Sequence, residues 1–262
     1  MKILDLIGNT PLINIGNIYI KMELLNPSGS IKDRIAYEMM KPYIFGLRKK
    51  LTIVEATSGN TGISIAMVCA VAGINCWILC PPDTSRKKVE LMMAYGAKIN
   101  HCSSIKQCTQ KAMQMVKDKQ ADVFLNQFNN LANVEAQKRI GKEVAEYIKP
   151  DAIVAGTGTG GTLMGLHRAF PDADIYEIYT SSKEPIEGIT DHVVQPLIPA
   201  NLERKRIGVP FEKAKETAEY LAQKHGIACG YSSGANYYVA KLISGGYRKV
   251  LTVFPDNRLR YL

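Results

Sequence analysis

The chain contains 262 residues, of which 46% are hydrophobic and 22% are charged, and it includes 21 glycines and 12 prolines. This composition is typical of a soluble globular protein with one large or two modest domains, and it excludes disordered, collagen-like and coiled-coil chains. The formal net charge is +9, but the basic clusters at residues 48–50, 86–88 and 204–206 are short and far apart. Because aromatic residues do not alternate with these clusters, we expect no nucleic-acid partner.

The cysteines, the histidines and the first residues bound the class of protein further. Six cysteines are too few for a disulfide scaffold of this length and none forms a Cys-x-x-Cys pair, so we expect reduced and mostly buried thiols. The four histidines are scattered without metal-ligand spacing, and we assign no metal site. The start, MKILDLIGNTPL, lacks the apolar core of a signal peptide, so we expect a cytoplasmic protein.

Apolar, β-rich runs alternate with helical patterns along most of the chain, which predicts an α/β fold with mostly parallel sheets. We expect strands at residues 52–55, 76–80, 98–101, 123–125, 152–155, 175–179 and 250–254. We expect helices from residue 31 onward and at residues 61–72, 85–95, 104–119, 134–148, 161–170, 211–225 and 233–244. Residues 180–210 show no regular pattern and are predicted as a long loop, a kind of segment that is usually functional or mobile.

The first of three loops rich in small polar residues is PSGSIKDR at residues 27–34. We predict that Ser30 caps a helix beginning at Ile31 and that Asp33 is the reciprocal capping residue. Lys32 then lies in the first turn, where the positive end of the helix dipole disfavours an ammonium group. Its pKa should be lowered, as an imine-forming lysine requires, and a solvated surface lysine is the alternative interpretation.

The second loop, TSGNTG at residues 57–62, directly follows a predicted strand. Gly59 and Gly62 allow a tight turn, while hydroxyl groups, backbone N–H groups and the Asn60 amide converge on a site that suits a carboxylate. A plain helix cap is the alternative here.

An apolar stretch at residues 63–80 is near the length that a bilayer requires. However, Gly73-Ile74-Asn75 divides the stretch and Pro81-Pro82 ends it. We therefore predict a buried helix followed by a buried strand, and no membrane segment.

The third loop, GTGTGGT at residues 156–162, follows a strand and precedes a helix. Glycines and hydroxyls at a helix start form a phosphate cradle from backbone N–H groups. However, Gly156, Gly158 and Gly161 also match the pattern G-x-G-x-x-G, and Glu177 follows 177 − 156 = 21 positions later, where a dinucleotide fold places its ribose-binding acid. An NAD-dependent oxidoreductase is therefore an alternative, although it leaves the other two loops unexplained.

Six motifs taken together resemble a known family. In this order, PSGSIKDR, TSGNTG, QFNN, GTGTGGT, GYSSGA and PDNRLRYL are similar to motifs of the cysteine synthase and cystathionine β-synthase family of pyridoxal-phosphate enzymes. IGNTPL and AYGAK fit as well, so the resemblance covers nearly the whole chain. It implies two interlocked three-layer α/β domains with the active site in the cleft between them. Residues 1–34 and 134–262 would form a large cofactor-anchoring domain, and residues 35–133 a small mobile substrate-binding domain.

The resemblance also implies roles for the loop residues. Lys32 would hold pyridoxal phosphate as a Schiff base and later remove the substrate α-proton. The other cofactor contacts would be Asn60 near the ring hydroxyl, Ser232 at the pyridine nitrogen, and Gly158, Thr159, Gly160, Gly161 and Thr162 around the phosphate. The substrate carboxylate would be bound by Thr57, Ser58, Asn60, Thr61 and Gln127. Because a neutral Ser232 hydroxyl stabilises a protonated pyridine less than a carboxylate would, quick loss of a β-leaving group is favoured.

The implied reaction is a β-replacement. An activated serine, expected to be O-acetylserine, would lose its β-substituent to give an aminoacrylate, and sulfide would add to form L-cysteine. Alternatives within the class are a cysteine desulfhydrase or hydrolytic lyase and a cystathionine-forming synthase, and a catalytically silent homologue is a further alternative. The implied partners are the small amino-acid substrate and sulfide, a second copy of the chain in a homodimer, and serine acetyltransferase.

Residues 187–193 depart from the family pattern. They read EGITDHV, where the family commonly has Gln-Gly-Ile-Gly-Ala-Gly-Phe. Asp191 or His192 could steer or activate water and so tune the nucleophile, or both could be solvated loop residues.

Overall fold

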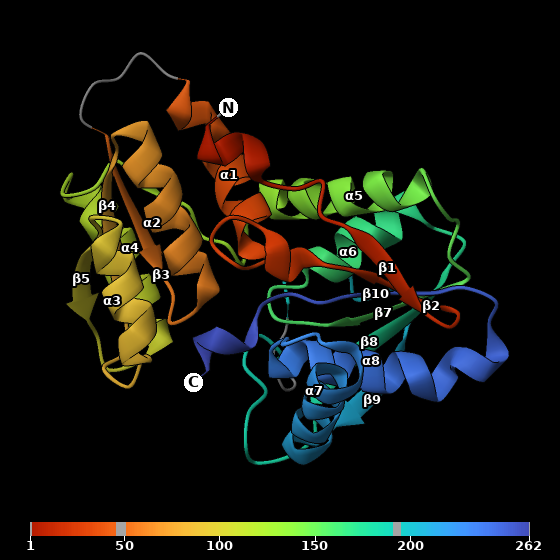
Figure 1. The fold of residues 1–262 in the computed structure, drawn as a ribbon. Coiled ribbons are helices and arrows are strands. Elements are labelled where there is room, and N and C mark those ends of the chain that lie inside the picture. The colour runs from red at the N-terminus through yellow and green to blue at the C-terminus, as the bar shows by residue number, and fades with distance from the viewer. Residues whose placement is uncertain (1, 46–50, 191–194, 262) are drawn as a thin grey trace.

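A computed structural model describes residues 2–45, 51–190 and 195–261, and its strands form two separate sheets (Figure 1). The strand order of the six-stranded sheet is β1 (Leu12–Ile15), β2 (Ile18–Lys21), β10 (Val250–Val253), β7 (Ala152–Gly156), β8 (Asp174–Thr180) and β9 (Lys205–Val209). The order of the four-stranded sheet is β5 (Lys98–His101), β4 (Asn75–Cys80), β3 (Thr52–Ala56) and β6 (Val123–Phe124). Every neighbouring pair is parallel except β1 with β2, which confirms the predicted α/β fold with mostly parallel sheets.

Helices cover both faces of each sheet and make two three-layer lobes, which we name the six-stranded and the four-stranded lobe. The helices of the six-stranded lobe are α5 (Leu131–Ala145) with α6 (Gly161–Ala169), and α7 (Phe211–His225) with α8 (Tyr231–Ile243) on the opposite face. Those of the four-stranded lobe are α2 (Asn60–Ala72) with α3 (Arg86–Ala94), and α4 (Ile105–Lys117) on the opposite face. Helix α1 (Lys32–Ile44) packs against both α2 and α5, so it joins the two lobes.

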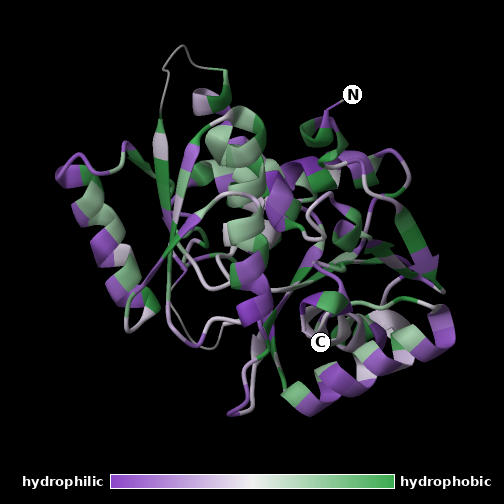
Figure 2. Cartoon of the chain, turned by 60° about the vertical axis from the view of Figure 1, so that its left-hand side comes forward, coloured by the Kyte–Doolittle hydropathy of each residue, from purple (hydrophilic) through white to green (hydrophobic). Residues whose placement is uncertain are grey.

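Separate hydrophobic clusters fill the space between each sheet face and its helices. In β10, Val250 belongs to the cluster under α8 and Leu251 to the cluster under α5 and α6, because successive side chains of a strand point to opposite faces. Figure 2 shows hydrophobic and hydrophilic residues alternating along the outer helices, as expected for helices that bury one face only. All six cysteines are free and buried, as predicted.

The apolar stretch at residues 63–80 is a buried helix followed by a buried strand, which confirms its sequence interpretation. Gly73, with φ of +68°, ends α2 in the left-handed conformation, and β4 begins two residues later. Across the described ranges, no helix is long and apolar enough to cross a membrane.

Three strands were not predicted. β1 and β2 form an antiparallel hairpin around Gly16-Asn17, and Gly16 has φ of +62°. The sequence IGNI carries this turn signal, but the two strands are only four residues long. β9 lies within residues 180–210, which we predicted as a loop, and that prediction is wrong at this point. β9 is an edge strand, so few of its side chains pack into the core. Its sequence KRIGV is therefore charged and partly exposed, which hides the strand pattern.

A buried charged network fixes the start of α1 against the six-stranded lobe. Arg34 donates to Glu23 from Nε at 2.6 Å and from Nη2 at 2.8 Å. It also donates to Glu143 of α5 from Nη1 at 2.6 Å and from Nη2 at 2.8 Å. Lys21 Nζ lies 2.6 Å from Glu143, and Arg34 and Glu23 are 4% and 0% exposed. The network ties β2, α1 and α5 together two residues from Lys32.

Candidate active site

A pocket lies between the two lobes, and residues from both lobes line it. Its walls come from the first residues of α1, the loops that follow β3, β6, β7 and β8, the first turns of α8, and the segment that follows β10. Ligands of parallel α/β sheets bind at these carboxyl ends of the strands. The three loops singled out in the sequence therefore meet at one place, as expected.

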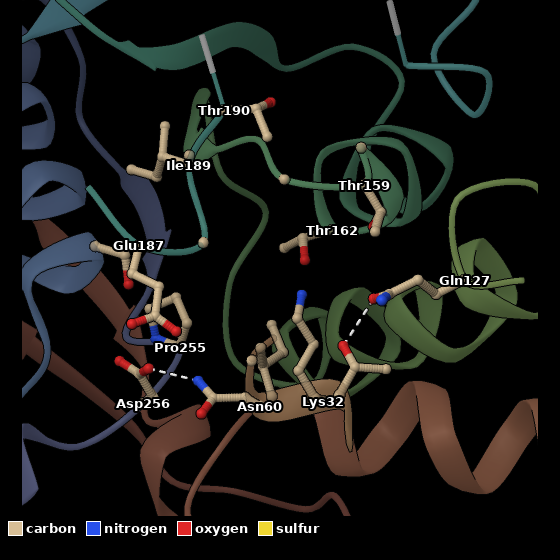
Figure 3. Close-up of a pocket in the computed structure, with 18 of the residues that line it drawn as sticks. Lys32, Asn60, Gln127, Thr159, Thr162, Glu187, Ile189, Thr190, Pro255 and Asp256 are labelled. Carbon is tan, nitrogen blue, oxygen red and sulfur yellow. Dashed lines mark hydrogen bonds between the residues drawn. The ribbon is translucent and has the colours of Figure 1, made fainter. Parts of the chain in front are cut away.

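Lys32 is the first residue of α1, and its amino group points into the pocket (Figure 3). Burial lowers the pKa of this amine, and the nearby negative charge of Asp256 partly opposes the shift. Within the part of the chain that the structure describes, no side chain or carbonyl accepts a hydrogen bond from Lys32 Nζ and no carboxylate forms an ion pair with it. A buried amine without a partner is costly and marks a group held ready for chemistry.

The predicted cap of this helix is confirmed only in part, since Ser30 Oγ accepts a hydrogen bond from the backbone N–H of Lys32 at 3.3 Å but Asp33 does not complete the capping box. The N-cap residue is Ile31, which makes no side-chain cap, and α1 begins at Lys32. Asp33 instead accepts hydrogen bonds from the backbone N–H of Ser28 at 2.6 Å and from Ser64 of α2 at 2.6 Å. The carboxylate therefore joins the start of α1 to the four-stranded lobe and does not close a local capping box.

The loop after β3 presents Thr57, Ser58, Asn60 and Thr61 to the pocket. Gln127, which follows β6, faces the same space, and Thr61 Oγ1 donates to Gln127 Oε1 at 2.7 Å (Figure 3). Hydroxyls, amides and the N-terminus of α2 form a region of hydrogen-bond donors that suits a carboxylate. The structure thus brings together all five residues that were predicted to bind the substrate.

Glu55 of β3 lies beneath this region and is 1% exposed. Burial raises the pKa of its carboxyl group from 4.5 to about 8, while hydrogen bonds from the backbone N–H groups of Ala56, Gln127 and Asn126 act in the opposite direction. Asn126 has φ of +51°, so the strained turn that presents Gln127 rests on this carboxyl group.

We expect Glu55→Gln to flatten the dependence of stability on pH. The raised pKa means that the folded chain keeps a proton which the unfolded chain loses above its ordinary pKa. Stability therefore falls as pH rises from about 4.5 to about 8. The glutamine of the variant has no proton to lose. The thermal midpoint of the variant, measured relative to that of the parent, should therefore rise as pH increases toward 8. Midpoints measured across this range check the prediction, and parallel profiles for the two proteins would contradict it.

The glycine-rich loop after β7 forms a close-fitting cradle. Gly158, Thr159, Gly160 and Thr162 line the pocket, whereas Gly161 lies behind it, where its N–H donates to Thr159 Oγ1 at 3.3 Å. Gly160 has φ of +86°. A Cβ atom on Gly158 would lie 2.7 Å from the Gly188 carbonyl oxygen, so only glycine fits there. Backbone N–H groups at the start of α6 are thus open to an anion.

The remaining predicted residues fall at two places. Ser232, in the first turn of α8, lines the pocket and is 5% exposed. Asp191 and His192 lie outside the described residues. Their neighbour Thr190 lines the pocket, and its Oγ1 donates to the Thr157 carbonyl at 3.0 Å.

Glu177 is not available to a nucleotide. It lies in the middle of β8, is 2% exposed, accepts a hydrogen bond from Thr157 Oγ1 at 3.0 Å and pairs with Arg204 and with Arg206 at 3.2 Å. A ribose-binding acid would lie free at the end of its strand. The NAD interpretation of the glycine pattern is therefore wrong.

Sequence reasoning missed the acidic side of the pocket, formed by Glu187 and Asp256. Figure 3 shows both carboxylates on the side opposite Gln127. Glu187 pairs with Lys88 of α3, an almost buried lysine, across the two lobes. Asp256 accepts hydrogen bonds from Asn60 at 2.6 Å and from the Tyr261 hydroxyl at 2.7 Å. The motif PDNRLRYL was a signal for this wall, but nothing local predicts that it reaches Asn60.

Comparisons with known proteins agree with this geometry. The family model described as "Pyridoxal-phosphate dependent enzyme" matches residues 3–256. The chain is 33% identical to cysteine synthase B of Campylobacter jejuni over 100% of this chain and 96% of that protein. It is 35% identical to a cysteine synthase of Staphylococcus aureus over 100% and 95% of the two chains.

Solved structures show the same fold. A hydrogen sulfide-producing enzyme from Fusobacterium nucleatum matches with a TM-score of 0.90 and 30% identity, over 99% of this chain and 97% of the other. An O-acetylserine dependent cystathionine β-synthase from Helicobacter pylori matches with a TM-score of 0.89 and 28% identity, over 99% and 96%. The similar proteins therefore share one architecture and differ in the reactions that their names describe.

Proposed function

The chain belongs to the family of pyridoxal-phosphate dependent enzymes, and from this premise we propose that it makes L-cysteine from O-acetylserine and sulfide by β-replacement. The observation that carries the proposal is the buried amine of Lys32, which has no partner among the described residues and lies between a glycine cradle and a carboxylate site.

The residues present fit the cofactor. Lys32 would hold it through the amine, whose lowered pKa keeps the nitrogen nucleophilic. The loop at residues 158–162 would hold the phosphate with backbone N–H groups, because its glycines leave no room for side chains. Ser232 would face the ring nitrogen and Asn60 the ring hydroxyl. When bound, pyridoxal phosphate withdraws electrons from the substrate Cα, which acidifies the α-proton and promotes loss of a β-substituent.

The chain's own residues would then perform three tasks. Thr57, Ser58 and Thr61, with Asn60 and Gln127, would bind and orient the substrate carboxylate. Lys32 Nζ, once free, would accept the α-proton, because burial lowers its pKa and so favours the neutral amine. The two lobes on either side of the pocket would limit the access of water while the β-position is reactive.

A second candidate is the release of sulfide from cysteine. It is favoured by the hydrogen sulfide-producing enzymes among the structural neighbours, which are 30% and 31% identical to this chain. It is also favoured by the polar residues at 190–192, where Asp191 or His192 would steer water to the β-carbon.

Two assays on the purified protein distinguish the candidates. The first measures cysteine formed from O-acetylserine and sulfide, and the second measures sulfide released from cysteine alone. The proposal predicts a higher kcat/KM in the first assay. A higher value in the second would replace it with the sulfide-releasing reaction, and Asp191→Asn would then test the role of Asp191, since unchanged rates would remove that residue from the chemistry.

The proposal includes the assembly and the motion of the enzyme. The large domain would comprise residues 1–34 and 134–262, and the small domain residues 35–133 would close on the substrate. We further propose a cytoplasmic homodimer that serine acetyltransferase can bind. The resemblance of the motifs supports these points.

A further inference from the structure

The segment after β10 reaches across the pocket to the first residue of α2. Asn60 Nδ2 donates to Asp256 Oδ2 at 2.6 Å (Figure 3), and Arg260 Nη1 donates to Asn60 Oδ1 at 3.0 Å. Both ends of the Asn60 amide are therefore held by residues almost 200 positions later in the chain. We name Asp256 and Arg260 the amide clamp.

The chemistry of the clamp allows a single orientation of the amide. A guanidinium can only donate hydrogen bonds, so it must meet the amide oxygen. A carboxylate can only accept them, so it must meet the amide NH2 group. Rotating the amide of Asn60 by half a turn would place a donor against Arg260 and an acceptor against Asp256. One N–H of Asn60 remains, and Asn60 lines the pocket.

The clamp residues are themselves held in place. The Tyr261 hydroxyl donates to Asp256 Oδ2 at 2.7 Å, and the Asp256 side chain lies so close to Gly230 that a Cβ atom there would be 2.1 Å from Oδ1. Asp256 and Arg260 are 2% and 9% exposed. Among the described residues, Asn60 is the only hydrogen-bond partner of the Arg260 side chain, and the carboxylates of Asp33 and Asp256 interact with its charge without a direct ion pair.

Arg260 is nine-tenths buried, and its side chain donates a hydrogen bond to a single neutral amide. Because burying a guanidinium costs desolvation free energy, this contact alone contributes little to the stability of the fold. Buried polar groups of this kind are common where a side chain must be held in a single geometry. The proposed cofactor requires such precision, since the negatively charged ring oxygen of pyridoxal phosphate would need a hydrogen-bond donor and would be repelled by a carbonyl oxygen.

We propose that Asp256 and Arg260 are positioning residues that present Asn60 as a hydrogen-bond donor, and not as an acceptor, to an anionic oxygen bound in the pocket. This inference rests on the proposed function, because the anionic oxygen is the ring oxygen of pyridoxal phosphate. It adds the motif PDNRLRYL to the cofactor site through residues that act by orienting Asn60.

The test compares variants of the holoenzyme that remove either side chain of the amide clamp with variants that keep the hydrogen bond to Asn60. Asp256→Ala frees the amide, whereas Asp256→Asn can still accept from Asn60 through its own carbonyl oxygen. Arg260→Met removes the donor, and Arg258→Met is the matched control, because Arg258 lies in the same segment but stacks on Tyr231 and does not contact Asn60. The measurements are the position of the visible absorption band, the affinity for pyridoxal phosphate and the thermal midpoint.

We expect Asp256→Ala to weaken cofactor affinity about tenfold and to shift the visible band. Asp256→Asn should restore both to near the parent values. Arg260→Met should weaken affinity by a smaller factor, since Asp256 still orients the amide, and Arg258→Met should match the parent.

Two results would contradict this inference and leave the proposed function unaffected. The first is an unchanged band and affinity in Asp256→Ala and Arg260→Met with a lower thermal midpoint, which is the signature of a purely structural role. The second is an Asp256→Asn variant that behaves like Asp256→Ala. A parent protein that shows no visible band with pyridoxal phosphate would overturn the proposed function and this inference together.

Discussion

Replacing Lys32 with alanine is expected to lower kcat/KM for β-replacement by at least about 10³-fold, because one amine would serve as both the cofactor anchor and the base. No other lysine among the described residues lines the pocket, so no neighbour can take over either task. The variant should fold, since the Lys32 side chain makes no hydrogen bond or ion pair with any residue that the structure describes.

Lys41→Ala is the matched control, because Lys41 lies on the same helix but does not line the pocket. Its amino group forms an ion pair with Glu38 at 2.8 Å. Steady-state rates with O-acetylserine and sulfide, measured at matched protein concentration, check the prediction. A Lys32→Ala enzyme within tenfold of the parent would show that the amine is not the reacting group.

Replacing Arg34 with methionine is expected to destabilise the protein by about 3–5 kcal/mol, the usual cost of removing one partner of a buried ion pair. Among the described residues, Lys21 would be the one cation left for both carboxylates, at 4.0 Å from the fully buried Glu23 and at 2.6 Å from Glu143. The loss should be global, because Arg34 joins β2, α1 and α5, and α1 links the two lobes.

Chemical denaturation of the two proteins measures this difference. Arg139→Met is the control, since Arg139 is 48% exposed and its pair with Glu38 at 3.0 Å should contribute less than about 1 kcal/mol. An Arg34 variant no less stable than the Arg139 variant would show that the network is not a main support of the fold.

The network also predicts how acid acts on the protein. Burial alone would raise the pKa of Glu143, but hydrogen bonds from Arg34 and Lys21 outweigh it and lower the pKa below its ordinary value. A lowered carboxyl pKa gives stability that is complete above the ordinary pKa and is lost as pH falls through the lowered one. The Arg34 variant should therefore lose less stability than the parent between neutral and acidic pH.

Much of the candidate site was predictable because its motifs are local. Gly158 and Gly160 stand directly between a strand and a helix, and Asn60 is the first residue of the helix that follows β3. A strand that ends in small polar residues and is followed by a helix places those residues at the carboxyl edge of a parallel sheet. This placement does not depend on contacts with distant parts of the chain.

The parts that were missed depend on contacts distant in sequence. Asp33 was expected to cap its own helix, but Ser64 and Ser28 hold it instead. Asp256 and Arg260 bind the amide of Asn60, which no local pattern indicates. β9 was hidden because an edge strand with exposed lysine and arginine has the composition of a loop.

The most direct test of the central claim is reduction of the holoenzyme with borohydride after its visible spectrum has been recorded. The protein should bind pyridoxal phosphate with a visible band that changes on addition of O-acetylserine and returns on addition of sulfide. Peptide mapping should then find the reduced cofactor on Lys32. A colourless protein, or a label on any other lysine, would contradict the assignment of this pocket and of its reaction.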